Sequence, residues 1–472
     1  MTTLDQTPLW TADAIARATH GHVGAPFAAT GISIDSRSLQ PGDVFFALQD
    51  QRDGHDFLAD AFARGAAGAV ISRPDCVEAG PCVLVGDVLA ALAALGEAAR
   101  RRSSARRIAV TGSVGKTTVT QGLARALGGI GATHAPTKSL NNHIGVPLTL
   151  TRLPEQTRFA VFEIGMNHAD EIRPLTRLVA PEAAIVTTIG PVHLENFDSV
   201  EGIADAKAEI FEGLVPGGPA IINADNPYAL RLTKAAAQLG APVWYFGEGE
   251  ACAARLRAME TDGRRTRIAI EIEGRLRHVT VEGIGAHWGY AAAAILLGAK
   301  ALGADVDLCA AALDGFGALD GRGAARELRL PGGGSFMLVD ESYNANPMSM
   351  AAAIKALAAR PTGLGGRRIA VIGDMLELGP DENALHAALA QDVAAARIDL
   401  VFCAGARSRH LWEALAPSQR GAFAPSANAL APALIEAIRP GDVVMAKSSN
   451  GSRISFVVEE LTRLAQSQGG QE

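Results

Sequence analysis

The sequence lacks paired cysteines and long apolar runs. Its 472 residues include five cysteines, at positions 76, 82, 252, 309 and 403, and none forms a C-x-x-C pair. An odd, scattered set argues against a disulfide framework and a cysteine metal site, and indicates free thiols in a reducing compartment. No run of about 18 apolar residues occurs, and the first residues, MTTLDQTPLW, lack the regions of a signal peptide. We therefore expect a cytoplasmic protein without membrane insertion.

The chain is also poor in aromatic residues, at 5 %, and has no long basic block. Its 43 Lys and Arg residues and 50 Asp and Glu residues give a net charge of −7. This balance argues against nucleic acid or an anionic membrane surface as the main partner. Hydrophobic residues at 48 % and charged residues at 20 % are typical of a globular protein. The length predicts three domains of about 150 residues each.

The most informative stretch is IAVTGSVGKTT, residues 108–118. It is typical of a strand, a glycine-containing loop and a helix that begins at Lys116. In that order, loop N–H groups and the helix N-terminus converge on one point that favours phosphate, and Lys116 reaches the terminal phosphates. The predicted contacts to a nucleoside triphosphate are Gly112, Ser113, Val114, Gly115, Lys116, Thr117 and Thr118, with the Thr117 hydroxyl on magnesium.

The match to the general pattern G-x-x-x-x-G-K-[ST] is incomplete, because Val110 stands where the first glycine belongs. The alternative interpretation is a glycine-rich turn that joins a strand to a helix and carries an exposed lysine.

Strands and helices alternate after residue 106. We expect strands at 107–111, 158–163, 183–189 and 220–222, and helices at 116–128, 170–179 and 200–214. This alternation predicts a parallel sheet covered on both faces, with ligands at the carboxyl ends of its strands. Glu163 and His193 follow two of these strands, so we expect magnesium or metal-water contacts there. Either residue alone could be an ordinary loop residue, and for His193 alone that interpretation is favoured.

Lys207 lies in the expected 200–214 helix, beside the apolar stripe that runs through Ile203 and Ile210. A lysine in this position either extends its apolar stem along the surface, with the amine in solvent, or has a functional role. Near magnesium ions, repulsion and desolvation would favour its neutral amine, which is the form that reacts with carbon dioxide. We therefore predict a carbamylated Lys207 that ligates metal. The alternative is a snorkelling lysine that pairs with a phosphate.

The flanking regions predict two further α/β units. In the first we expect helices at 11–19, 56–64 and 88–102, strands at 68–72 and 81–85, and a β-hairpin made by TGISIDSRSL and VFFAL. Residues 253–282 favour antiparallel hairpins appended to the central sheet. Beyond the glycine-rich segment 316–327, four strand ends that carry Gly, Asp, Asn or Lys predict a second open sheet. The expected domains are 1–102, 103–325 and 326–472.

Several motifs occur in a fixed order: IDSR, PGDVFFAL, DGHDF, TGSVGKTT, LNNHIGVPLTL, FEIGMNHADEI, VHLENFDSVEGIADAKAEIF, VDESYNANPMSM and GDMLELG. Together they resemble the Mur ligase family, the ATP-dependent amide-forming enzymes of peptidoglycan precursor synthesis, over essentially the whole chain. Four of them, LNNHIGVPLT, EIGMNH, DESYNANPMSM and GDMLELG, most resemble members that add D-alanyl-D-alanine to UDP-N-acetylmuramoyl-tripeptide. The D-N-P-R motif typical of members that add the third amino acid is missing, since the D-N-P at 225–227 precedes Tyr228 in the central domain.

The resemblance implies an α/β fold of three domains: a small N-terminal uridine-binding domain, a central parallel-sheet ATPase domain with the phosphate loop, and a C-terminal Rossmann-like open sheet for the acceptor. It implies ATP and Mg²⁺ as cofactors and a monomer. Lys116, Lys207 and His193 would be catalytic, and Thr117, Glu163, His193 and Lys207 would hold the metal. Besides the phosphate loop, His287, Arg322 and Asp340 would bind ATP. The substrates would contact Ser36, Arg37, Asn141, Asn142, Tyr343, Asn344 and Asn346.

Two positions depart from the family pattern. Trp288 follows His287 where relatives often have asparagine, which removes a side-chain amide from the adenine site. Val114 stands where relatives commonly have asparagine, a change of little consequence if backbone amides bind the phosphates. Ser36 and Arg37 are explained equally well as a turn serine and a surface arginine.

Two other functions share these features. A nucleotide-switched binding or transport-type ATPase would use the same loop and hydrolyse ATP without an acceptor. A folylpolyglutamate-type ligase would share the central fold but would not need the N-terminal IDSR and PGDVFFAL motifs. The ligase is expected to form an acyl phosphate on the substrate carboxylate, because a free carboxylate is a poor electrophile toward an amine.

Overall fold

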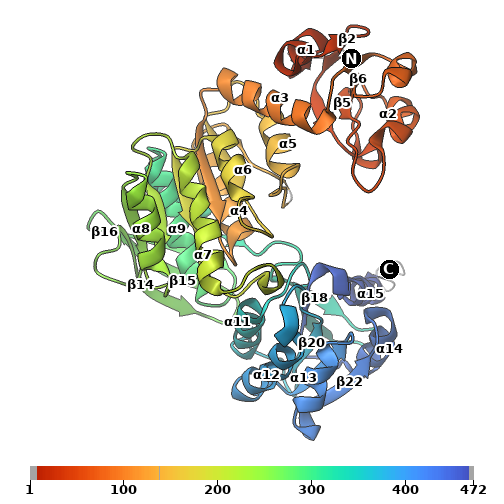
Figure 1. The fold of residues 1–472 in the computed structure, drawn as a ribbon. Helices are drawn as coiled ribbons and strands as arrows, with labels where there is room; N and C mark the ends of the chain where they lie inside the picture. The colour runs from red at the N-terminus through yellow and green to blue at the C-terminus, as the bar shows by residue number, and fades with distance from the viewer. Residues whose placement is uncertain (1–7, 138, 467–472) are drawn as a thin grey trace.

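The structure is a computed structural model that describes residues 8–137 and 139–466. Figure 1 shows an N-terminal lobe in red and orange, a central lobe mostly in yellow and green, and a C-terminal lobe mostly in blue. Each lobe is built around one large β-sheet with helices beside it, which confirms the expected three-domain α/β fold. Within the described ranges, no helix is both long and apolar enough to cross a membrane.

The N-terminal lobe holds a five-stranded sheet in the order β2-β7-β6-β5-β4. The elements of this lobe are β1 (Trp10–Thr11), α1 (Ala12–Thr19), β2 (His22–Val23), β3 (Ala28–Ala29), β4 (Gly31–Ser33), β5 (Asp43–Phe46), α2 (Leu58–Ala63), β6 (Gly68–Ile71), β7 (Cys82–Leu84) and α3 (Val88–Arg102). The expected β-hairpin is wrong, because β4 and β5 pair in parallel. Residues 34–42 return the chain through the short 3-10 helix η1 (Ser36–Ser38) and bury Leu39, so both strands start at the same end of the sheet.

Direct contacts fix the N-terminal lobe to the central lobe. The Arg102 guanidinium, at the end of α3, donates to the Leu153 carbonyl of the central lobe at 3.4 Å. The Trp10 indole N–H donates to the Thr151 carbonyl at 2.8 Å, and the Arg152 guanidinium donates to the Ile32 carbonyl. These bonds satisfy buried polar groups at the junction, which stabilises one arrangement of the two lobes.

The central lobe holds a ten-stranded sheet in the order β17-β16-β15-β14-β13-β12-β11-β8-β10-β9. Its strands are β8 (Arg106–Thr111), β9 (Thr133–His134), β10 (Phe159–Glu163), β11 (Ala183–Val186), β12 (Ala220–Asn223), β13 (Val243–Gly247), β14 (Ala254–Thr261), β15 (Thr266–Ile272), β16 (Arg275–Glu282) and β17 (Phe316–Gly317). Its helices are α4 (Lys116–Gly128), α5 (Gly145–Thr151), α6 (Ile172–Val179), α7 (Val200–Ala208), α8 (Ala229–Gln238), α9 (His287–Ala301) and α10 (Val306–Leu313). Strands β8 to β13 pair in parallel, while β14, β15 and β16 form the expected antiparallel hairpins.

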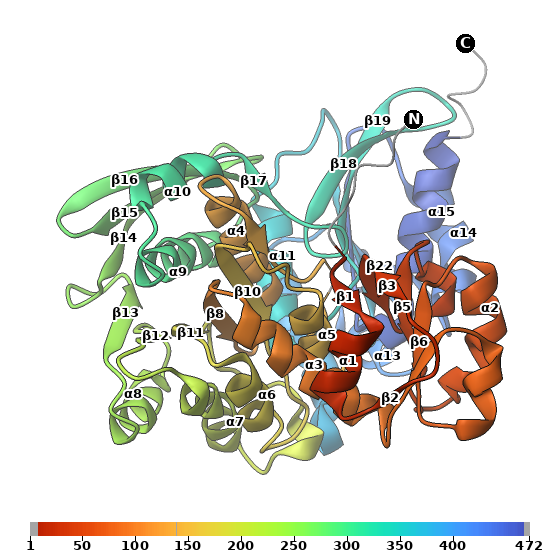
Figure 2. The same cartoon turned by 90° about the horizontal axis from the view of Figure 1, so that it is seen from above.

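Helices cover both faces of this sheet, as Figure 2 shows: α4, α9 and α10 lie on one side of the strands and α6, α7 and α8 on the other. The alternation of side chains along β8 explains the two layers. Ile108 and Val110 pack into the core beneath α4 and α9, while Ala109 packs into the core of the opposite face. The expected 200–214 helix is shorter than predicted, since α7 ends at Ala208 and a 3-10 turn, η5 (Glu209–Gly213), follows.

The C-terminal lobe holds a six-stranded sheet in the order β18-β19-β23-β20-β21-β22, in which only β18 and β19 pair antiparallel. Its elements are β18 (Ala324–Arg329), β19 (Ser335–Glu341), α11 (Pro347–Ala358), β20 (Arg368–Gly373), α12 (Glu382–Ala395), β21 (Leu400–Ala404), α13 (Ser408–Ala414), β22 (Arg420–Ala424), α14 (Ala427–Ala437), β23 (Val443–Lys447) and α15 (Ser455–Gln466). The boundary expected between residues 325 and 326 falls inside β18.

Candidate active site

A pocket of about 650 Å³ opens at the carboxyl ends of β8, β10, β11 and β12. The central lobe contributes Lys116, Glu163 and His193 to its wall, and the segment that leads to the C-terminal sheet contributes Arg322. Tyr343 faces them from the C-terminal lobe. Ligands of open parallel sheets bind at such an edge, so this pocket is the candidate active site.

The loop between β8 and α4 has the shape that the sequence predicts. Gly112 has φ +145°, and a Cβ there would lie 1.9 Å from the Thr187 hydroxyl oxygen; Gly115 has φ +86° and caps α4. Glycine is needed at both positions because other residues rarely adopt these angles. The Thr187 hydroxyl donates to the Val114 carbonyl at 2.6 Å, and Lys116 Nζ donates to the Gly112 carbonyl at 2.7 Å.

The structure also shows the positions of two further predicted phosphate-loop residues, Ser113 and Thr118. The Ser113 hydroxyl exchanges hydrogen bonds with Gly190, since it donates to the Gly190 carbonyl and accepts from the Gly190 N–H, each at 3.0 Å. Thr118 lies in the first turn of α4 and lines the pocket. The loop is therefore tied to the segment that follows β11.

Glu163, the last residue of β10, is 2 % exposed. Its Oε2 accepts from the Thr117 hydroxyl at 2.8 Å. Its Oε1 accepts from the Ser139 hydroxyl at 2.9 Å and the Asn141 amide at 2.7 Å. Burial lowers the pKa of Lys116, and the nearby Glu163 carboxylate acts in the opposite direction. These bonds bring together three residues that the sequence marked separately, Thr117, Asn141 and Glu163.

The oxygen atoms around Glu163 suit Mg²⁺, which prefers carboxylate and hydroxyl oxygens and takes its other ligands from phosphate and water. In the described part of the chain, no group of three or more His, Cys, Asp and Glu side chains could hold a metal ion. A magnesium ion at this position would therefore need oxygens from a bound nucleotide, from water or from a modified side chain.

Lys207 is fully enclosed on α7, with an exposure of 1 %. Within the described ranges, its ammonium has no hydrogen-bond or ion-pair partner. Burial lowers the pKa of Lys207 well below its usual value, and repulsion from Lys116 lowers it further. A snorkelling lysine would instead reach solvent with its amine, which the burial of Lys207 does not allow.

His193 contacts the C-terminal lobe. Its Nδ1 lies 2.5 Å from Glu377 Oε2, and the two residues are 184 positions apart in the chain. The hydrogen bond to His193 lowers the pKa of the Glu377 carboxyl. His193 also lines the pocket, so this contact links the pocket to the GDMLELG segment.

The segment between the central and C-terminal sheets carries Arg322, which lies 4.0 Å from the centre of the Tyr343 ring and within the pocket wall. Asp340 does not line the pocket. Its carboxylate instead accepts from the N–H of Gly321 and from both the N–H and the hydroxyl of Ser342. Asp340 therefore holds the backbone next to Arg322.

The other predicted substrate residues have different surroundings. Asn344 and Asn346 line the pocket, and the Asn346 side chain also caps α11 through the N–H of Ser349. The Asn142 side chain accepts the N–H groups of residues 144 and 145 just before and at the start of α5, and it does not line the pocket. His287 lines the pocket, while Trp288 is buried against the ring of Phe316.

Ser36 and Arg37 lie in the N-terminal lobe, outside this pocket. Ser36 is buried, and its hydroxyl contributes to lowering the pKa of Asp60. The Arg37 guanidinium forms a two-point ion pair with Asp35 at 2.7 and 2.9 Å. This pair lies just beyond the carboxyl end of β4, where an open sheet presents its ligand-binding edge.

Sequence reasoning missed several residues of the pocket wall: Ser139, Thr187, Tyr290, Glu341 and Lys447. Lys447 is 2 % exposed, and its ammonium donates to Glu341 Oε2 and to the Asn344 carbonyl. A usable signal existed for two of them. Glu341 and Lys447 are the last residues of the adjacent parallel strands β19 and β23, and strand ends of this kind meet at one edge.

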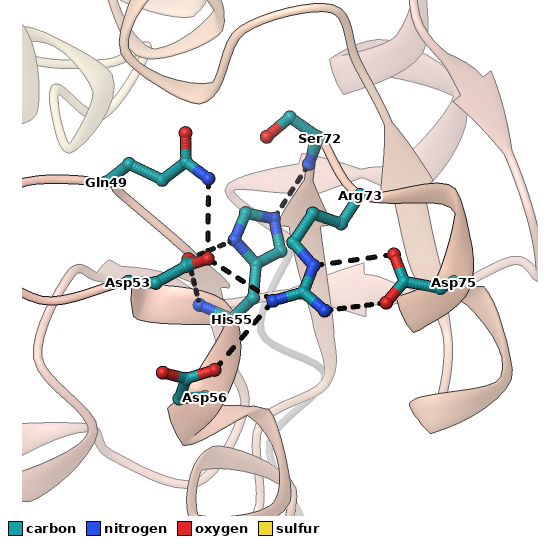
Figure 3. Close-up of polar contacts among 7 residues, drawn as sticks. All are labelled: Gln49, Asp53, His55, Asp56, Ser72, Arg73 and Asp75. Atoms are coloured by element: carbon teal, nitrogen blue, oxygen red, sulfur yellow. Dashed lines mark hydrogen bonds and ion pairs between the residues drawn. The ribbon is translucent and has the colours of Figure 1, made fainter.

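The DGHDF motif forms a polar cluster in the N-terminal lobe (Figure 3). His55 is buried; its Nδ1 lies 2.6 Å from Asp53 Oδ1, and its Nε2 accepts the N–H of Ser72 at 2.9 Å. Burial alone would raise the pKa of the Asp53 carboxyl, but hydrogen bonds from His55 outweigh it and hold this pKa at about 2. Arg73 adds ion pairs to Asp53 and Asp75. The cluster ties the loop after β5 to the end of β6.

We expect His55→Ala to lower the free energy of local opening in this lobe by about 2 to 3 kcal/mol, because the substitution leaves a cavity and an unsatisfied N–H at Ser72. Hydrogen exchange of peptides that cover residues 68–77 measures the opening free energy. Asp75→Ala, which removes an exposed ion pair, is the matched control and should lower the free energy of local opening by less than about 1 kcal/mol. Equal protection in both variants would show that the His55 bonds do not stabilise the loop.

Comparison with known protein families identifies the class of protein to which this chain belongs. Residues 28–110 match the Mur ligase family, catalytic domain; residues 110–298 match the Mur ligase middle domain; and residues 329–450 match the Mur ligase, glutamate ligase domain. The chain belongs to the Mur ligase family.

Individual relatives and solved structures show which members of the family this chain is similar to. The UDP-N-acetylmuramoyl-tripeptide–D-alanyl-D-alanine ligase of Escherichia coli is 36 % identical over 82 % of this chain and 83 % of the relative. The crystal structure of MurF from Acinetobacter baumannii has a TM-score of 0.84 at 28 % identity and covers 98 % of this chain and 100 % of that chain. The MurF ligase of Thermotoga maritima in complex with ADP has a TM-score of 0.77 at 25 % identity and covers 93 % of this chain and 98 % of that chain.

Proposed function

We propose that this chain is an ATP-dependent ligase that joins D-alanyl-D-alanine to UDP-N-acetylmuramoyl-tripeptide in peptidoglycan precursor synthesis. The observation that carries the proposal is the pocket in which the phosphate loop of the central lobe faces the DESYNANP segment of the C-terminal lobe. Similarity to enzymes of that name along most of both chains supports the choice of substrates. A cytoplasmic monomer fits the role.

In the proposed reaction, an oxygen of the tripeptide carboxylate attacks the γ-phosphorus of ATP, and ADP leaves. The product is an acyl phosphate, whose carbonyl carbon is then attacked by the neutral dipeptide amine. The C–N bond forms, the bond from that carbon to the phosphate oxygen breaks, and phosphate leaves with one carboxylate oxygen and the proton that the amine gives up. Lys116 neutralises charge on the transferring phosphoryl group, and the loop N–H groups hold the phosphates in line. Arg322 lines the same pocket and adds a second cation.

Mg²⁺ is the proposed metal, and it would supply further charge neutralisation for the phosphates when bound. The residues proposed to hold it are Thr117, Glu163, His193 and a carbamylated Lys207. The bonds that Glu163 accepts from Thr117 and Asn141 orient its carboxylate toward the phosphate loop. Enclosure of the pocket by two lobes would keep water from the acyl phosphate.

Glu163→Gln should raise the magnesium concentration for half-maximal phosphate release about tenfold or more. The substitution removes the negative charge but keeps the size of the side chain, so the fold should be unaffected. Titrating activity with Mg²⁺ at saturating ATP measures the effect. An unchanged titration would show that Glu163 only orders the bonds to Thr117 and Asn141.

We further propose that the N-terminal lobe binds the uridine part of the substrate and that the C-terminal lobe selects the acceptor. Tyr343, Asn344 and Asn346 lie beside the pocket on the acceptor side. Exchanging residues 326–472 for those of a ligase that adds the third amino acid should change the acceptor and leave uridine nucleotide binding within about twofold. Loss of uridine binding in the exchanged protein would contradict these roles.

A phosphate-release assay with a panel of UDP-muramoyl peptides and of amino-acid or dipeptide acceptors tests the substrate assignment. Phosphate should appear at a substantial rate only with UDP-muramoyl-tripeptide and D-alanyl-D-alanine together. Release without an acceptor would favour a nucleotide-switched ATPase. Turnover without a uridine-linked substrate would favour a folylpolyglutamate-type ligase.

A further inference from the structure

The segment after β11, residues 187–197, lies between the phosphate loop and the C-terminal lobe. On one side, Thr187 holds the Val114 carbonyl, and Gly190 exchanges two hydrogen bonds with Ser113. On the other side, Met348 of α11 packs so closely on Gly190 that a Cβ there would lie 2.3 Å from the Met348 methyl group. The segment therefore touches both the phosphate loop and the C-terminal lobe.

This segment also makes a short polar contact with the C-terminal lobe, between His193 and Glu377. The two side chains meet at 2.5 Å, with 21 % of the His193 side chain and 47 % of the Glu377 side chain exposed. Two residues further along each segment, the backbones also meet, because a Cβ on Gly379 would lie 3.5 Å from the Glu195 Cα. The contact thus joins two loops along several residues.

Both residues of this pair have an unusual backbone conformation. His193 has φ +53° and Glu377 has φ +62°, in the left-handed region that residues other than glycine rarely adopt. Such conformations cost free energy and persist where the surroundings fix them, often at functional positions. Their occurrence on both sides of one contact indicates that the two loops are shaped to present these side chains to each other.

The bond also decides which ring nitrogen of His193 is occupied by a partner. Glu377 accepts a hydrogen bond from His193 Nδ1–H, which leaves Nε2 as the nitrogen available to other partners. A carboxylate that binds one imidazole nitrogen fixes the orientation and tautomer of the ring and makes the other nitrogen a better ligand.

We propose that Glu377 is a positioning residue for phosphoryl transfer. Through Nδ1 it orients the His193 ring, with Nε2 toward the pocket, when the C-terminal lobe is docked as seen here. The acceptor-binding lobe thereby completes the site where ATP reacts, and phosphoryl transfer depends on docking of that lobe. The inference rests on the proposed ligase function and adds to it a residue from outside the pocket wall.

The test combines kinetics with a double-mutant cycle. Glu377→Ala should lower kcat about 10- to 100-fold, the usual effect of removing such a partner, and change KM for ATP by less than about threefold. In a His193→Gln background, Glu377→Ala should have no further effect on kcat, because Glu377 acts through the ring. Glu413→Ala, which removes an exposed carboxylate of the same lobe, should match the wild type. Independent, multiplying effects of the two substitutions would overturn the proposal.

A second readout needs no turnover. In the full chain labelled with ¹⁵N-histidine, the His193 ring should give the Nδ1–H pattern in the wild type, assigned by its loss in His193→Gln. Glu377→Ala should shift the ring toward Nε2–H, whereas Glu413→Ala should not. An unchanged ring signal in Glu377→Ala would overturn the proposal even if kcat fell. Because this signal is independent of substrates, it remains decisive if the wild type proves not to form the amide, a result that would overturn only the ligase assignment.

Discussion

Lys116→Ala should lower phosphate release on the order of 10³-fold while the protein stays folded. Removing one group that stabilises charge in a transition state typically has an effect of this size. Among the residues that the structure describes, Lys116 Nζ bonds only to the Gly112 carbonyl, and Lys116 lines the pocket, so its loss leaves the core intact. Steady-state phosphate release measures the effect, and the melting temperature reports the fold.

Lys116→Arg is the informative companion variant. It keeps the positive charge but replaces a compact ammonium by a broad, planar group that the tight loop does not fit, so activity should stay low. Near wild-type phosphate release in Lys116→Ala would contradict the assignment of the ATP site to residues 112–118.

Lys207→Ala and Lys207→Arg should both be inactive, with losses on the order of 10²-fold or more, if Lys207 carries a carbamate that ligates Mg²⁺. The physical case is that the Lys207 side chain is buried and forms no ion pair with any described residue, and that Lys116 repels its charge; both effects favour the neutral amine. Addition of carbon dioxide to that amine forms an N–C bond, releases one proton and converts a potential cation into an anion with two oxygens. Such an oxygen pair suits Mg²⁺.

Rescue of the Lys207→Ala variant by added carboxylates distinguishes a metal-binding carbamate from a purely structural role of Lys207. Acetate or formate at millimolar concentrations should restore part of the activity of Lys207→Ala, because a short carboxylate fills the vacated space. Lys234→Ala, on the exposed face of the neighbouring helix α8, is the control and should behave as the wild type with or without acetate. Full activity in Lys207→Arg would rule out the carbamate.

The features that could be predicted from the sequence are local or periodic. The phosphate loop follows from one strand, one loop and one helix in succession, and Glu163 from its place at the end of a buried strand. The sequence predicts Lys207 beside the apolar stripe, but its complete burial depends on the neighbouring elements that pack over α7. Helical periodicity gives the direction of a side chain and leaves its final exposure to tertiary packing.

The features that could not be predicted depend on pairing between distant segments. The strands β4 and β5 have the apolar pattern of a hairpin, and only their parallel register shows that residues 34–42 cross back over the sheet. The His193–Glu377 contact joins residues 184 positions apart, so no local pattern marks it. Asn142 and Asp340 lie in motifs of the family, yet their side chains bond to nearby backbone N–H groups, a use that composition does not distinguish from ligand binding.

The path of one oxygen atom tests the central claim most directly. UDP-N-acetylmuramoyl-tripeptide labelled with ¹⁸O in its reacting carboxylate is incubated with ATP, Mg²⁺, D-alanyl-D-alanine and the wild-type protein, and the released phosphate is analysed by mass spectrometry. An acyl phosphate predicts one ¹⁸O atom in each phosphate, because the carboxylate oxygen that attacks the γ-phosphorus leaves with it. Phosphate free of ¹⁸O would show that water attacks ATP, and would contradict the ligase mechanism.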